Sequence, residues 1–126
     1  MGFIVSNPNP NNNLTGDCVI RAISIAENRS WDDIFVELMV KCFNLKDMPS
    51  TNSAWGHYLH DLGYTRTVIP NECPDCYTIN DFANDHPKGT YIAATGTHVV
   101  TIRSGNYYDT WDSGQEPVLY YWSKEN

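Results

Sequence analysis

Cys18 is the residue whose type and position in this chain best suit nucleophilic chemistry. It follows Asp17 and precedes apolar residues with helical spacing, at Val19, Ala22, Ile23 and Ala26. With Thr15 or Asp17 as the N-cap, Cys18 falls in the first turn of the predicted helix. Unpaired amide groups and the positive end of the helix dipole favour the thiolate there, and the thiolate is the reactive form of cysteine. Asp17 opposes this ionisation unless its carboxylate is turned away or serves as the cap.

A cysteine nucleophile needs a base, and His98 is the histidine best placed to be one. It opens a predicted β-strand over residues 98–103, and a strand is a rigid mount for a base. His57 and His60 are expected on the solvent side of a helix, because they fall opposite its apolar residues. His86 precedes Pro87 and is expected in a loop.

Two aspartates compete for the third position, which must accept a hydrogen bond from the other ring N–H of the histidine. Asp109 lies at the end of the next predicted strand, which pairs with the strand of His98 in a hairpin. Asp112 falls in the following turn, where aspartate is common for local backbone reasons. We favour Asp109, and Asp112 remains the alternative.

Thioester chemistry also needs hydrogen-bond donors for the oxyanion that develops on the carbonyl. The backbone amide of Cys18 is one expected donor. A side-chain amide just upstream is the other, and the chain offers Asn11, Asn12 and Asn13 there.

The elements that must position these residues are helices first and strands second. Helices are predicted after Asp17, after Ser30, after Thr51 or Ser53, and over residues 79–85. Short strands are predicted over residues 67–69, 91–95, 98–103, 106–111 and 118–122, with a hairpin turn at Ser104-Gly105. The Pro- and Asn-rich residues 1–13 are expected to form no regular element. The chain therefore predicts a single α+β domain over residues 1–126, with N-terminal helices packed on a C-terminal antiparallel sheet.

Composition argues against some classes of partner. The chain of 126 residues carries a formal net charge of −7. Nucleic acid and anionic membranes attract clustered Lys and Arg, so neither is expected as a partner. The sequence has neither a signal-peptide pattern nor a run of about 18 apolar residues. We expect a cytoplasmic protein with reduced cysteines, and the sequence gives no oligomeric state.

The order of these residues resembles that of papain-like cysteine peptidases. In that superfamily a cysteine at a helix start is followed by a histidine on a later strand and by Asn or Asp on the next strand. Asp109-Thr110-Trp111 is similar to the Asn-Ser-Trp of papain, and Asn12 stands six residues before Cys18, where family members carry Gln. The chain most resembles the compact bacteriocin-processing (double-glycine leader) peptidases and small papain-like proteins of phages and gut bacteria.

The resemblance implies a papain-like fold and a catalytic triad of Cys18, His98 and Asp109, with Asn12 in the oxyanion hole. It implies a cysteine hydrolase, a peptidase or isopeptidase, that acts on a peptide or protein substrate without a cofactor. Val19-Ile20-Arg21 departs from the Gly or Ser-Trp that usually follows the cysteine. Specificity is expected to come from loops 48–53 and 68–77.

Three other readings are open. The same triad geometry can run acyl transfer or transglutamination, because these reactions also pass through a thioester. A non-catalytic binding role, such as that of a phage-encoded inhibitor, is the second. The third is a zinc site, made by Cys73 and Cys76 with His57 and His60, although these histidines are expected to face away from the core.

Overall fold

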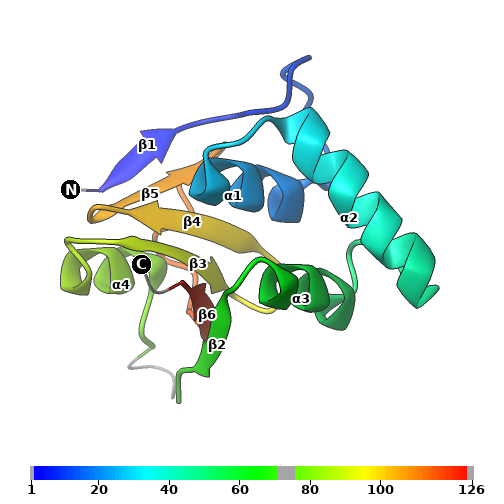
Figure 1. Cartoon of the computed structure of the whole chain (residues 1–126). Helices are drawn as coiled ribbons and strands as arrows, with labels where there is room; N and C mark the ends of the chain where they lie inside the picture. Colours follow the sequence, from blue (N-terminus) through cyan, green and yellow to red (C-terminus); the bar gives the residue numbers. More distant parts are fainter. Residues whose placement is uncertain (1, 71–75, 125–126) are drawn as a thin grey trace.

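A six-stranded mixed β-sheet forms the centre of the fold (Figure 1), in the strand order β1-β5-β4-β3-β6-β2. The structure is a computed structural model and describes residues 2–70 and 76–124. The strands are β1 (Phe3–Val5), β2 (Thr65–Val68), β3 (Thr90–Ala94), β4 (Val99–Arg103), β5 (Asn106–Asp109) and β6 (Tyr120–Ser123). Neighbouring strands are antiparallel except β1 and β5, which are parallel.

The first strand corrects two expectations. The segment of residues 1–13 does contain a regular element, β1, and its parallel pairing makes the sheet mixed rather than antiparallel. Phe3 and Val5 pair with Tyr107 and Asp109, and the backbone amide of Ser6 continues the pairing with a 2.8 Å hydrogen bond to the carbonyl of Asp109. A strand of three residues leaves almost no periodic signal, so only its tertiary partner defines it.

In the described part of the chain, four helices cover the two faces of the sheet. They are α1 (Cys18–Glu27), α2 (Trp31–Leu45), α3 (Asn52–Asp61) and α4 (Ile79–Asp85). Residues of α1, α2 and α3 share one apolar cluster with Ile92 and Trp122, whereas α4 packs on the other face, against Val100 and Ile102. The α+β class is therefore confirmed, with the three N-terminal helices on one face and α4 on the opposite one.

Local sequence signals explain where most elements begin. The Ser30 side chain accepts a 3.1 Å hydrogen bond from the amide of Asp33 at the start of α2. Thr78 and Asp81 form a reciprocal capping box at the start of α4. The β4–β5 hairpin turns at Ser104 and Gly105, both with positive φ, as a two-residue turn requires.

The helix that begins with Cys18 is fastened to the central strand β4. Thr101, in the middle of that strand, is fully buried and donates a 2.5 Å hydrogen bond from its hydroxyl to the carbonyl of Ala22 in α1. Because His98 directly precedes β4, this bond fixes the helix of Cys18 relative to the strand that follows His98.

None of the helices in residues 2–70 and 76–124 combines the length and the apolar character needed to cross a bilayer.

Replacement of Thr101 by Val tests how much this attachment contributes. Valine keeps the shape but removes the donor, so we expect Thr101→Val to lower the free energy of unfolding by about 0.5–1.5 kcal/mol. Chemical denaturation measures the change, and Thr67→Val on the exposed strand β2 is the matched control. Equal stabilities of the two variants would show that the hydroxyl contributes nothing.

Candidate active site

Cys18 is the first residue of α1, and its half-buried side chain faces the segment that enters β4. The side chain of His98 and the backbone amide of Val99 lie close enough to the thiol to lower its pKa. Burial alone would raise the pKa of the Cys18 thiol, but His98, the backbone amide of Val99 and the positive charge of Arg21 together outweigh burial and lower this pKa below its ordinary value. Cys18 is therefore disposed to ionise.

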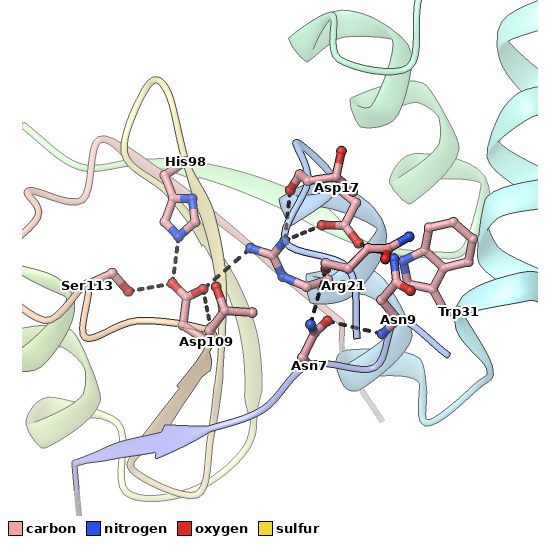
Figure 2. Close-up of polar contacts among 11 residues, drawn as sticks. Asn7, Asn9, Asp17, Arg21, Trp31, His98, Asp109 and Ser113 are labelled. Carbon is pink, nitrogen blue, oxygen red and sulfur yellow. Dashed lines mark hydrogen bonds and ion pairs between the residues drawn. The ribbon is translucent and has the colours of Figure 1, made fainter. Parts of the chain in front are cut away.

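His98 connects this thiol to a carboxylate. Its Nε2 atom lies 2.5 Å from Oδ2 of Asp109 (Figure 2), which leaves Nδ1 for Cys18. The ring packs against Trp111, with ring centroids 5.0 Å apart. Burial alone would lower the pKa of His98, but hydrogen bonds and charges from Asp109 and Cys18 outweigh it and raise the pKa to about 9. The pair of pKa shifts favours a thiolate beside an imidazolium.

Asp109 ends β5, and its buried carboxylate is surrounded by donors. Besides His98, it accepts from the hydroxyl of Ser113 at 2.7 Å, the backbone amide of Thr110 at 2.8 Å and the guanidinium of Arg21 at 3.5 Å. Burial alone would raise the pKa of Asp109, but the hydrogen bonds from His98 and Ser113 keep it below its ordinary value. The carboxylate is thus charged and fixed in orientation.

Asp112 lies in the turn after β5 and has different partners. It accepts hydrogen bonds from the hydroxyl of Tyr107 at 2.6 Å and from the amide of Gly114 at 3.0 Å. The structure therefore brings Cys18, His98 and Asp109 together and gives Asp112 a role in shaping the turn.

A second layer of polar residues lies behind the three, and the sequence analysis missed it. Arg21, one turn after Asp17, is buried and forms ion pairs with both Asp17 and Asp109. The remaining contacts of Asp17 come from the side chains of Asn9, at 3.3 Å, and Trp31, at 2.9 Å (Figure 2). The i, i+4 spacing of Asp17 and Arg21 was the one signal that indicated this pair.

Asn12, the residue that the papain-like pattern places in the oxyanion hole, lies elsewhere. It is exposed, has a φ of 56° and turns the loop through a 2.9 Å bond from its backbone amide to Asn9. Asn9 and Asn13 line the cleft beside Cys18, whereas Asn12 does not. The Asn9 amide is bonded to Asp17. Among the described residues, none hydrogen-bonds the side-chain amide of Asn13, so this amide can donate to a molecule in the cleft.

Cys18 and His98 open into a cleft of about 580 Å³. Its walls come from the loop before α1, the start of α1, α2, α3, the loop before β4, and Ala94 and Tyr120 of the sheet. Trp31 and Phe35 of α2 stack in one wall with ring centroids 4.9 Å apart. Pro49 and Ser50 from the first of the two loops expected to give specificity also line the cleft. The second loop, 68–77, falls partly outside the described residues.

The zinc reading has no support in the described part of the chain. His57 and His60 are exposed on α3, as expected, and the described residues contain no group of three or more His, Cys, Asp or Glu side chains that could hold a metal ion. Cys76 is disulfide-bonded, contrary to the expectation that all four cysteines are reduced. Cys73 lies outside the described residues.

Comparisons with protein-family models, curated proteins and solved structures found no match.

Thiol labelling tests the environment of Cys18. Burial and the nearby Asp47 raise the pKa of Cys42, the other free cysteine among the described residues, whereas the pKa of Cys18 is lowered. We expect iodoacetamide at neutral pH to modify Cys18 at least about tenfold faster than Cys42, as followed by peptide mass spectrometry.

His98→Ala should remove this preference, and His57→Ala, which changes an exposed histidine, should preserve it. Equal labelling rates at Cys18 and Cys42 in the unmodified protein would contradict the assignment of Cys18 as a reactive thiol.

Proposed function

We propose that this protein is a papain-like cysteine hydrolase that cleaves peptide or isopeptide bonds through a thioester on Cys18. The observation that carries the proposal is the position of His98, which is hydrogen-bonded to the buried carboxylate of Asp109 and shares a cleft with the thiol of Cys18, the first residue of a helix. Nucleophile, base and orienting group are the parts that this chemistry requires.

The first half of the reaction forms the thioester. The Cys18 thiolate attacks the carbonyl carbon of the scissile bond, and the oxyanion is met by the Cys18 backbone amide and the side-chain amide of Asn13. Collapse of the tetrahedral intermediate breaks the carbon–nitrogen bond, and the imidazolium of His98 gives its proton to the departing amine. The acyl group remains on sulfur and His98 is left neutral.

The second half returns the enzyme to its starting state. Neutral His98 takes a proton from a water molecule, which attacks the thioester carbonyl and releases the carboxylic acid. The Cys18 thiolate leaves, and the proton stays on His98. Throughout, Asp109 holds the imidazole in one orientation and stabilises its positive charge.

The arrangement of elements supports the papain-like assignment. Cys18 begins a helix on one side of the site, whereas His98 and Asp109 come from the ends of adjacent antiparallel strands, β4 and β5. Trp111 covers the His98 ring, as the resemblance to Asn-Ser-Trp implies. The cleft walls supply Trp31, Phe35 and other uncharged side chains, which suits a peptide segment without charges near the scissile bond.

Digestion of a peptide library tests the proposal. The unmodified protein should generate new peptide termini, detected by mass spectrometry, that Cys18→Ala fails to generate and the control Cys42→Ala still generates. Turnover should fall as the pH rises through about 9, because His98 then loses the proton that the leaving amine needs.

Identical digests from the unmodified protein and Cys18→Ala would overturn the proposal. Products in which the acyl group is joined to an added amine, in place of hydrolysed products, would assign the same thioester to acyl transfer.

A further inference from the structure

Arg21 is a buried arginine held between two carboxylates. It lies on α1 with 6% of its surface exposed. One guanidinium nitrogen, Nη1, bonds Asp17 and also reaches the carbonyl of Thr15 at 3.4 Å. The other, Nη2, lies 3.5 Å from Oδ1 of Asp109 (Figure 2). A guanidinium can hold two carboxylates at once because its donors form a fixed planar fork.

Asp17 directly precedes the cysteine and lines the same cleft, so an unpaired charge on its carboxylate would oppose a thiolate there. It is the N-cap residue of α1, yet its side chain does not cap the helix. One carboxylate oxygen is bound by Arg21, and the other accepts from the side chains of Asn9 and Trp31. The carboxylate is therefore neutralised by Arg21 and also anchors an aromatic ring that lines the cleft.

We propose that Arg21 is a positioning residue that binds the carboxylates of Asp17, next to Cys18, and of Asp109, which bonds His98. Arg21 thereby fixes the orientation of both carboxylates and neutralises the charge of Asp17. The inference rests on the proposed function. In this account Asp109 stabilises the His98 imidazolium, and Arg21 prevents Asp17 from opposing the Cys18 thiolate.

The charged groups around the Cys18 thiolate show why a second cation, Arg21, is needed. Arg21 lies on α1, Asp17 is the N-cap residue before that helix, His98 lies in the segment before β4 and Asp109 ends β5. Within the described chain, the cleft walls contributed by α2 and α3 carry no charged side chain, and β6 adds the hydroxyl of Tyr120. Loss of Arg21 would leave two buried carboxylates with the single cation of His98. The positive charge of Arg21 also contributes directly to the lowered pKa of Cys18.

The test measures the rate of Cys18 alkylation by iodoacetamide against pH in Arg21→Met, Arg21→Lys and the double variant Arg21→Met/Asp17→Asn. We expect Arg21→Met to move the midpoint of the profile upward by about one pH unit, because the thiolate loses a cation and gains an unpaired carboxylate as neighbour. In the double variant, loss of the Asp17 charge should reverse at least half of this upward shift. The midpoint of Arg21→Lys should lie between those of the unmodified protein and Arg21→Met, since one ammonium cannot span both carboxylates.

Arg29→Met is the matched control, because Arg29 also pairs with a carboxylate, that of Glu37, through contacts outside the cleft. Its profile should equal that of the unmodified protein. Asp17→Asn alone provides a second measurement if Arg21→Met does not fold. It keeps Arg21 and removes one negative charge, so its midpoint should move downward.

The outcomes distinguish a failure of the proposed function from a failure of the role assigned to Arg21. A slow, unselective Cys18 in the unmodified protein would overturn the proposed function. A fast Cys18 whose pH profile is unchanged in Arg21→Met, or unchanged in Asp17→Asn, would overturn the role of Arg21 alone. An upward shift in Arg21→Met without recovery in the double variant would show that Arg21 acts without neutralising Asp17, and would overturn that part of the proposal.

Discussion

The rest of the site depends on the burial of a charged Asp109 carboxylate. An ionised carboxylate is costly to remove from water unless donors replace its hydration, and Asp109 retains only 3% of its surface exposed. Its four donors come from separate parts of the chain: His98 before β4, Arg21 on α1, and the backbone of Thr110 and hydroxyl of Ser113 in the turn after β5. Each element that supplies a donor must be held in place for the carboxylate to remain charged.

The loops around the site hold the donors of the Asp109 carboxylate in place. Asp112 holds the turn after β5 through Tyr107, and a Cβ added at Gly114 would collide with the Tyr107 side chain, so a larger residue here would displace that ring. The turn thereby returns Ser113 to the carboxylate of Asp109. On the other side, β1 pairs with β5 along Asp109, and the chain then runs through Asn9 to Asp17 (Figure 1). The segment before α1 therefore contacts the polar network at two places, beside Asp109 through β1 and at Asp17 through Asn9.

Local patterns in the sequence predicted much of this arrangement. Cys18 at a helix start, His98 at the entry to a strand and Asp109 at the end of the next strand follow from periodicity and turn chemistry, which act over a few residues. The hairpin at Ser104-Gly105 places β4 beside β5 and so brings His98 and Asp109 to the same end of the sheet. These are relations between neighbours in the chain or in one hairpin.

Relations that depend on tertiary contacts were not predictable in the same way. The strand β1 exists because β5 offers it a partner 104 residues along the chain, at Tyr107 for Phe3. The position of Asn12 follows from a loop that is shaped by amide side chains and has no period to read. Nothing in the sequence near Arg21 indicates its ion pair with Asp109, because that contact forms only when β5 packs beside α1. The choice of Asn12 came mostly from the papain-like pattern, whereas in the structure Asn9 and Asn13 line the cleft.

The central claim is that Cys18 forms a covalent thioester, and intact-mass spectrometry tests it most directly. The protein is mixed with an activated peptide ester and quenched in acid, and the acylated residue is located by digestion. The account predicts one added acyl group on Cys18, sensitive to hydroxylamine and absent from Cys18→Ala. No acylation, or acylation at another residue, would contradict it.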